Sequence, residues 1–307
     1  MTIRRVGVTG AAGFIGRHVV SDLRSGGCQV VGIGRHPGDV VDLVDDLADV
    51  GVLRDFFESE DIDSVVHCAW TGHPRSSAHD FGGQLRSNVV TSANVGLASG
   101  LAGVDQLVFI SSGGASHTGS RDLPPPAYGW GKMAAEGVLG ATAESFGTTL
   151  TVLRPTAVFG PGQNPQDRLG AVAVFADKLL RGVALDVFGS LEQSRDFLHV
   201  RDLADAVLCC VSQRIPGVFP VGGPDQVTIG SLIRILEAAT GRVADVRLVP
   251  GTGLDSDVVY LDNSALTAAT GWVPKRDLPS SIDEVVDDQL RLQHLDQTTR
   301  SETIADR

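Results

Sequence analysis

The chain has 307 residues, of which 42% are hydrophobic and 20% charged, and its formal net charge at pH 7 is −12. This composition fits a soluble globular protein with one large α/β domain, or a domain plus a smaller lobe. The negative charge argues against nucleic acid or anionic lipid as a partner, because both require basic surfaces.

No stretch of the sequence has the length and apolarity of a signal peptide, and no run of about 18 apolar residues could span a membrane. The four cysteines show no CxxC spacing, which favours burial as small hydrophobic side chains in a reducing compartment. We therefore expect a cytoplasmic protein. The cysteines are Cys28, Cys68, Cys209 and Cys210.

Short β-rich runs alternate with helix-like stretches in the first half of the chain. This alternation predicts a doubly wound parallel sheet with helices on its faces. The predicted strands are 4–10, 28–34, 64–70, 105–112 and 150–160, with a first helix at 14–27. Beyond about residue 165 the rhythm changes to a helix at 170–183, a strand leading into a helix at 196–213, and a helix at 228–242 that Thr228 could cap.

The first strand runs directly into the sequence TGAAGFIG, which opens the first helix. Glycines at this point permit a tight turn, close approach of the backbone to a pyrophosphate, and close packing of helix on strand. The pyrophosphate would meet free N–H groups at the helix N-terminus. The pattern predicts a dinucleotide site that includes Gly10, Gly13, Phe14, Ile15 and Gly16.

The end of the second strand bears on the choice of cofactor. An NAD site usually has an acidic residue here, whereas Gly34 stands at that position and Arg35 follows it. A guanidinium can pair with a 2′-phosphate, so NADP(H) is favoured and NAD stays possible.

Tyr128 and Lys132 are four residues apart and share one face of a predicted helix. An ammonium near a phenol favours the phenolate, so we expect Lys132 to lower the pKa of Tyr128 and suit it to proton transfer. Ser112, at the end of the strand 105–112, is the candidate that positions the substrate oxygen.

In their order along the chain these motifs resemble those of the extended short-chain dehydrogenase/reductases, the NAD-dependent epimerase/dehydratase family. The resemblance covers most of residues 3–290. The matching stretches are TGAAGFIG, DSVVHCAW, Asn88 in RSNVV, LVFISSGG, YGWGK, LRPTAVFGPGQ, RDFLHVRDLADA and DNSALTAATGWVP.

The resemblance implies a Rossmann-type fold and Ser112, Tyr128 and Lys132 as the catalytic set. It implies that Arg195, with Ser112 and Tyr128, binds a nucleotide-sugar substrate, and that the chain forms a homodimer through two helices per subunit. It also implies cofactor contacts from the glycine loop, Tyr128, Lys132, Asp46, Leu47, Ala69, Asn88 and Pro155.

Departures from the family pattern reduce the number of reactions that the chain is expected to catalyse. Gly113 and Gly114 stand where sugar-nucleotide dehydratases carry an acid pair, which argues against elimination of water. The favoured function is reduction of a keto group of a nucleotide sugar, with Tyr128 as general acid. One alternative is a nucleotide-sugar 4-epimerase that retains NAD, and another is a non-catalytic protein that senses NADP.

The predicted domains are a dinucleotide-binding domain at 1–165, joined again by roughly 195–225, and a substrate-binding lobe mainly at 166–290. The polar segment 293–307 is expected to be disordered. His67 and His199 lie in strand-like runs and are expected in the core, whereas His73 and His79 lack metal-ligand spacing and are expected on a loop.

Overall fold

The computed structural model describes residues 4–72, 81–113, 127–167, 170–250 and 258–305. The chain divides into two compact units. Unit 1 consists of Met1–Thr156, Val200–Gly222 and Leu261–Pro274, and unit 2 consists of Ala157–His199, Gly223–Tyr260 and Lys275–Arg307.

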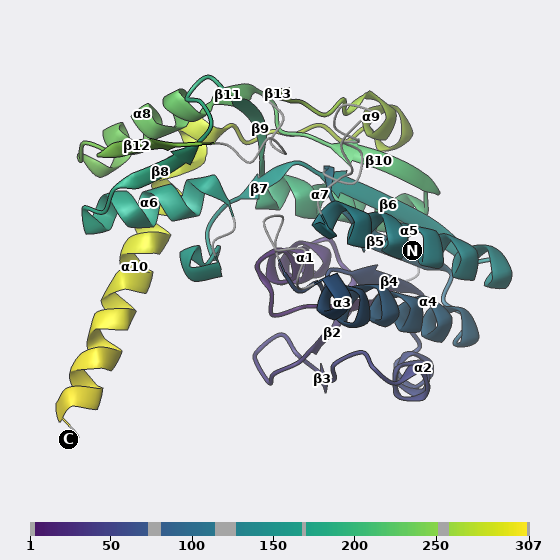
Figure 1. The fold of residues 1–307 in the computed structure, drawn as a ribbon. Helices are drawn as coiled ribbons and strands as arrows, with labels where there is room; N and C mark the ends of the chain where they lie inside the picture. Colours follow the sequence, from purple (N-terminus) through teal and green to yellow (C-terminus); the bar gives the residue numbers. More distant parts are fainter. Residues whose placement is uncertain (1–3, 73–80, 114–126, 168–169, 251–257, 306–307) are drawn as a thin grey trace. The chain divides into compact units, whose positions relative to one another are not determined.

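Unit 1 is built on a parallel sheet, shown in Figure 1. In the part of the chain that the structure describes, the strand order is β10-β6-β5-β4-β1-β2-β3 and every neighbouring pair is parallel. This order confirms the predicted doubly wound sheet. The strands are β1 (Arg5–Thr9), β2 (Gln29–Gly34), β3 (Leu43–Val44), β4 (Ser64–His67), β5 (Gln106–Ile110), β6 (Thr149–Pro155) and β10 (Gly217–Val221).

The strand order reverses at β1. The neighbours of β1 are β2 on one side and β4 on the other. The connection from β1 to β2 and the connection that leads on to β4 therefore cover opposite faces of the sheet. Parallel strands end at one edge, and ligands of such sheets bind where the order reverses. The turn after Thr9 and the segment after His67 therefore flank the expected cofactor position, because these two residues are paired in the register.

Helices cover the sheet of unit 1, with α1 packed against α7 and α4 packed against α2 and α5. Apolar side chains such as Phe57, Phe109 and Leu139 are fully buried between strands and helices. The helices are α1 (Phe14–Ser25), α2 (Val50–Ser59), α3 (Phe81–Gln84), a π-helix (Leu85–Val90), α4 (Thr91–Leu101), α5 (Ala127–Phe146), α7 (Val200–Gln213) and α9 (Ser264–Thr270).

The segment Leu261–Pro274 belongs to unit 1, although the sequence placed it in the substrate-binding lobe. Two contacts hold it there. The Asn263 carboxamide oxygen accepts a hydrogen bond from the Gly222 N–H (2.6 Å), and the Trp272 indole donates to the carbonyl oxygen of Asp202 (3.0 Å). These long-range contacts have no local signature in the sequence. The substrate-binding role of unit 2 stays a prediction.

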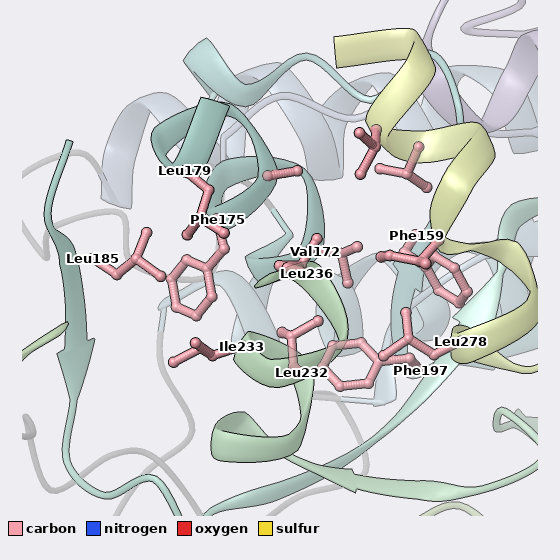
Figure 2. Packing of buried hydrophobic residues seen from close by; sticks show 14 of the residues in the cluster. Phe159, Val172, Phe175, Leu179, Leu185, Phe197, Leu232, Ile233, Leu236 and Leu278 are labelled. Carbon is pink, nitrogen blue, oxygen red and sulfur yellow. The ribbon is translucent and has the colours of Figure 1, made fainter. Parts of the chain in front are cut away.

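Unit 2 has its own hydrophobic core, shown in Figure 2, where Phe175, Leu232 and Phe197 lie among α6, α8 and β9. The predicted cap of α8 is present, because the Thr228 hydroxyl accepts from the Ser231 N–H (3.0 Å). The remaining elements are β7 (Ala157–Phe159), a 3₁₀ helix (Pro165–Asp167), α6 (Ala171–Arg181), β8 (Leu185–Phe188), β9 (Ser194–His199), β11 (Gln226–Thr228), α8 (Ile229–Thr240), β12 (Val246–Val249), β13 (Val258–Val259) and α10 (Leu278–Ala305).

Helix α10 continues to Ala305 and so includes most of the range 293–307 that the sequence favoured as disordered. The segment is polar but contains no glycine or proline after Pro279, so it holds neither of the residues that most strongly end a helix. Of the helices that the structure describes, none is both long and apolar enough to cross a bilayer.

Candidate active site

The turn between β1 and α1 is shaped by its glycines. Gly10 has a φ of +70°, and a Cβ atom there would lie 2.7 Å from the backbone nitrogen of Ala69. A Cβ atom at Gly16 would overlap the carbonyl oxygen of Gly10. Helix and turn therefore approach each other closely only because side chains are absent. This cradle fits a dinucleotide, which needs close approach of its pyrophosphate to the backbone.

Gly13 leaves the N-terminus of α1 uncapped. It is the N-cap residue, and among the described residues no side chain accepts a hydrogen bond from the first turn. The Arg17 guanidinium folds back onto the carbonyl oxygens of Ala12 (2.9 Å) and Gly13 (3.3 Å). The helix start at Phe14 and Ile15 thus keeps backbone N–H groups and a nearby positive charge, both of which favour an anion.

The end of β2 offers a guanidinium rather than a carboxylate. Arg35 is exposed, and within the described residues its side chain makes no hydrogen bond or ion pair. The nearby carboxylate of Asp42 accepts from the Gly32 N–H (2.7 Å). A side chain at Gly32 would overlap the carbonyl oxygen of Val40, so this hydrogen bond depends on glycine. Asp42 is thereby engaged with the backbone of β2, and Arg35 is the available charge next to Gly34.

Leu47 adopts a left-handed backbone conformation, with a φ of +64°, although it is buried and not glycine. Its N–H donates to the Asp45 carboxylate (2.5 Å) and its carbonyl oxygen accepts from the Asn94 carboxamide (2.9 Å). The Asp46 carboxylate accepts from the Ala48 N–H (3.1 Å). Such strain is concentrated at functional sites, which supports the predicted contact of Leu47 with the cofactor.

Ser112, Tyr128 and Lys132 come together at the carboxyl end of β5. Ser112 follows the strand, and Tyr128 and Lys132 lie one turn apart on α5. The Tyr128 hydroxyl is hydrogen-bonded to the Ser112 side chain. The three residues that the sequence predicted as a catalytic set therefore lie together in the structure. Ser112 is linked to Tyr128 by this hydrogen bond, and Tyr128 and Lys132 share one face of α5.

Lys132 is a buried cation with 3% of its surface exposed. Its ammonium donates to the carbonyl oxygen of Ile110 (2.7 Å) and lies 3.8 Å from the centroid of the Trp70 ring and 4.9 Å from that of Phe109. Burial lowers the pKa of Lys132 to about 7, and the nearby Cys68 and Glu136 side chains oppose this shift. In the described part of the chain the ammonium makes one hydrogen bond, so it retains donors for a ligand.

The net shift of the Tyr128 pKa is upward, whereas the sequence predicted that it would be lowered. Burial raises the pKa of Tyr128 to about 12, and the hydrogen bond from Ser112 only partly opposes the rise. The Lys132 ammonium lies 6.0 Å from the centroid of the phenol ring. Loss of water around the phenol is the largest cause of the shift, and Tyr128 is protonated at neutral pH. A protonated phenol is a hydrogen-bond and proton donor.

Ala69 and Asn88 belong to the segment that follows β4. The Ala69 N–H donates to the Thr9 hydroxyl (3.3 Å), which joins this segment to the glycine turn. Asn88 is buried in the π-helix, and its carboxamide accepts from the Thr71 N–H and donates to the Thr71 carbonyl oxygen (both 2.8 Å). Asn88 therefore fixes the backbone beside the cofactor position, whether or not it also contacts the cofactor.

His67 is an uncharged core residue. Burial and the charge of Lys132 lower its pKa to about 3. Its ring nitrogens bond to the hydroxyls of Thr9 (2.6 Å) and Ser92 (3.0 Å), and the ring stacks on Phe109. Among the described residues no group of three or more side chains is arranged to hold a metal ion.

The remaining predicted residues lie in different places. The carbonyl oxygen of Pro155 would be 3.1 Å from a Cβ atom at Gly113, so Pro155 adjoins the residue after Ser112. Arg195 lies on β9 in unit 2, where its guanidinium donates to the Ser194 carbonyl oxygen (2.7 Å). His199 is buried in unit 2, as predicted, and lies 2.7 Å from the Glu284 carboxylate. Outside the described residues lie His73, His79 and Gly114.

Two charged residues of the site were not predicted from the sequence. Glu136 lies one turn after Lys132 on α5, and its carboxylate pairs with Arg154 on β6. The spacing of four between Lys132 and Glu136 is a signal that sequence reasoning can use. Arg154 lies 18 positions further along the chain, and no local pattern links it to Glu136.

Comparison with known proteins places this geometry in a family. Residues 6–222 match the family model described as NAD dependent epimerase/dehydratase family. The chain is 25% identical to a dTDP-4-dehydro-6-deoxyglucose reductase of Escherichia coli, over 93% of this chain and 98% of the relative.

Solved structures agree with the sequence comparison. A UDP-glucose 4-epimerase of Thermotoga maritima, solved with UDP-glucose, has a TM-score of 0.86 and 27% identity and covers 94% of this chain and 99% of its own. A UDP-glucose 4-epimerase of Thermus thermophilus, solved with NAD, has a TM-score of 0.81 and 28% identity and covers 93% of this chain and 98% of its own.

Proposed function

Because the chain belongs to the NAD dependent epimerase/dehydratase family, we propose that it reduces a keto group of a nucleotide-linked sugar, with NADPH as the favoured hydride donor. The observation that carries the proposal is the pairing of Ser112 with a protonated Tyr128 beside Lys132. A reduction needs a proton donor at the carbonyl oxygen, and the phenol is held in the donor state.

Each residue of the set has a distinct task. Ser112 donates a hydrogen bond that positions the substrate oxygen, and Tyr128 delivers its proton to that oxygen. Lys132 binds the nicotinamide ribose with the donors that it does not use on Ile110. When bound, the reduced nicotinamide supplies the hydride. The phenol then regains its proton from solvent before the next turnover.

The preference for NADPH rests on Arg35. Its exposed guanidinium follows β2, and Gly34 supplies no carboxylate to bind the ribose hydroxyls of NAD. A 2′-phosphate would gain a charge-assisted hydrogen bond there, and the same phosphate would be repelled by an acidic residue. The glycine cradle and the uncapped start of α1 bind the pyrophosphate in either dinucleotide.

A nucleotide-sugar 4-epimerase is the second candidate function. It is favoured by the similarity to UDP-glucose 4-epimerases solved with UDP-glucose or NAD. An epimerase oxidises and re-reduces the same sugar and must retain its cofactor through both steps. A reductase releases oxidised cofactor after every turnover.

The deciding experiment identifies the cofactor that the purified protein carries. The protein is denatured, and any released dinucleotide is identified by chromatography and mass spectrometry. The native protein is then assayed with NADPH and a dTDP- or UDP-linked 4-keto sugar. The proposal expects little retained dinucleotide and consumption of NADPH. Stoichiometric NAD together with interconversion of UDP-glucose and UDP-galactose would establish the epimerase instead.

We also propose that the protein is a homodimer and that it is located in the cytoplasm. Helices α4 and α5 pack together, and Leu97, Leu101 and Phe146 on these helices are exposed apolar side chains that a homodimer would bury. Sedimentation of Leu101→Glu beside the natural protein tests the dimer. None of the four cysteines forms a disulfide in the described structure, which supports a reducing cytoplasm.

A further inference from the structure

The end of β5 is bonded residue by residue to helix α5. Three successive residues of the chain take part, and each reaches a different turn of the helix. The hydrogen bonds join Ser112 to Tyr128, the Ile110 carbonyl oxygen to the Lys132 ammonium, and the Ser111 hydroxyl to the Glu136 carboxylate. The partners on α5 are spaced by four residues and so lie along one face of the helix. The register of strand on helix thus determines whether Ser112 reaches Tyr128.

Of the three α5 residues in these bonds, Glu136 also pairs with a charged side chain on another element, Arg154. Both of its carboxylate oxygens bond to the Arg154 guanidinium, at 3.0 Å and 2.5 Å. The two side chains are 11% and 24% exposed, so the pair is largely shielded from water. A two-pronged pair of this kind fixes orientation as well as distance. Because Arg154 lies on β6, the next strand of the sheet, Glu136 ties α5 to two strands at once.

Glu136 is also a carboxylate that acts on Lys132, because its charge opposes the lowering of the Lys132 pKa. Among the other groups around the ammonium, His67 and Tyr128 are neutral at pH 7, with pKa values of about 3 and about 12. The Cys68 thiol is neutral as well, because burial raises its pKa to about 12. A buried ammonium without a nearby anion tends to lose its proton.

We propose that Glu136 is a positioning residue of the active site, which holds β5 in register on α5 through Ser111 and Arg154 and supplies a negative charge that acts on Lys132. The positions of the residues and the charge of Lys132 do not depend on which reaction the protein catalyses. The consequence for turnover rests on the proposed function.

The chain has only three lysines, Lys132, Lys178 and Lys275, so the charge of Lys132 can be measured directly. Protein labelled with ¹³C at the lysine ε-carbon gives three signals, and Lys132→Met identifies the one that belongs to the site. The titration of this signal is compared in the natural protein, Glu136→Gln and Glu144→Gln. Glu144 is an exposed residue of the same helix and serves as the matched control.

In Glu136→Gln the pKa of Lys132 is expected to fall by about one unit, because the amide keeps the shape but loses the charge. The high-pH limb of kcat should move to lower pH by a similar amount. Glu144→Gln should leave both unchanged. A Lys132 pKa that is the same in folded Glu136→Gln and in the natural protein would overturn the inference.

A second variant covers the case in which Glu136→Gln does not fold. Glu136→Asp keeps the charge and shortens the side chain, so the titration of Lys132 should stay near that of the natural protein while kcat falls. A titration shift as large as that expected for the glutamine variant would contradict a role for the charge. These titrations need neither cofactor nor substrate. A protein without reductase activity but with a titration that depends on Glu136 would overturn the proposed function alone.

Discussion

The side-chain ammonium of Lys132 lies 3.8 Å from the centroid of the Trp70 indole ring, in a position that is 3% exposed. A cation over an aromatic face is stabilised by the ring, and the effect is largest where water is excluded. Trp70 also meets Tyr128 edge to face, with ring centroids 6.1 Å apart. The indole therefore contacts both residues of the predicted proton-transfer pair.

Trp70→Leu should reduce turnover more at high pH than at low pH. Loss of the aromatic face removes about 2 kcal/mol of stabilisation from the protonated form of Lys132, which lowers its pKa by about 1.5 units. Lys132 would then be neutral over more of the neutral range. The measurement is kcat between about pH 5.5 and about pH 9 for Trp70→Leu and for Trp70→Phe, which keeps a ring. Parallel profiles for the leucine variant and the natural protein would show that the ring is only packing.

Tyr128→Phe should lower kcat by about 10²- to 10⁴-fold, the usual contribution of a general acid. The binding of NADPH should change little, because the phenyl ring preserves the packing against Trp70. Turnover is followed by NADPH absorbance and binding by fluorescence titration. The chain has one other tyrosine, Tyr260, which is 53% exposed, and Tyr260→Phe is the control expected to keep full turnover. Full activity of Tyr128→Phe on a true substrate would remove the phenol from the mechanism.

Lys132 should make stability depend on pH. Its pKa is about 7 in the folded protein and near 10.5 when exposed, so the unfolded chain binds more protons between these values. Stability of the natural protein should therefore rise with pH through this window, by up to about 1.4 kcal/mol per pH unit from this group. Below about pH 7 the cost of burying the charge is fully present. Lys132→Met lacks this dependence.

The check is denaturant unfolding of both proteins at about pH 6.5, 8 and 9.5. Lys132→Met should have its greatest relative stability at the lowest pH and lose that advantage as the pH rises. A stability difference that is constant across these pH values would mean that the lysine titrates as an exposed residue does.

Gly16, the third glycine of the turn between β1 and α1, allows a test of whether close packing there is needed for stability and for dinucleotide binding. Gly16→Ala places a methyl group against the carbonyl oxygen of Gly10, so the turn must open or α1 must shift. We expect a loss of more than about 2 kcal/mol of stability, as in overpacked sites, and loss of dinucleotide binding. Gly140→Ala on α5 is the matched control, because a Cβ atom there meets nothing within 4 Å. It should stabilise the helix by about 0.5 to 1 kcal/mol. Equal effects of the two substitutions in thermal melts and NADPH titrations would refute this account.

Sequence patterns predicted the elements of the fold and most of the site because those features are local. The glycine turn, the alternation of strand and helix, and the spacing of Tyr128 and Lys132 each lie within one short segment. The cap at Thr228 was visible for the same reason. Their convergence then follows from the strand order of a parallel α/β sheet.

Features that depend on burial or on distant contacts could not be predicted in this way. The pKa of Tyr128 is set by the loss of water around it, which the four-residue spacing does not encode. The Glu136–Arg154 pair links a helix to a strand. The left-handed conformation of Leu47 is accompanied by a hydrogen bond to the Asp45 carboxylate and one from the Asn94 carboxamide, and a leucine gives no sign of it in the sequence.

Arg35→Ala should weaken the binding of NADPH by about 10-fold or more and leave that of NADH nearly unchanged. The substitution removes a charge-assisted hydrogen bond that only the 2′-phosphate can accept, and such a bond is worth about 1.5 to 3 kcal/mol. Gly34→Asp is the companion variant and should shift the preference towards NADH. Its Cβ atom would lie 3.0 Å from a methyl group of Val41, which a small side-chain adjustment can relieve.

The dissociation constants of NADPH and NADH are measured for Arg35→Ala and Gly34→Asp by fluorescence titration. The ionic strength is held fixed because phosphate contacts are screened by salt. The ratio of the two dissociation constants is the decisive quantity, since it cancels any general loosening of the glycine turn. An equal loss of affinity for NADPH and NADH in Arg35→Ala would place the guanidinium away from the 2′-phosphate. The preference for NADPH would then have no support from the end of β2, and the epimerase with retained NAD would become the better assignment.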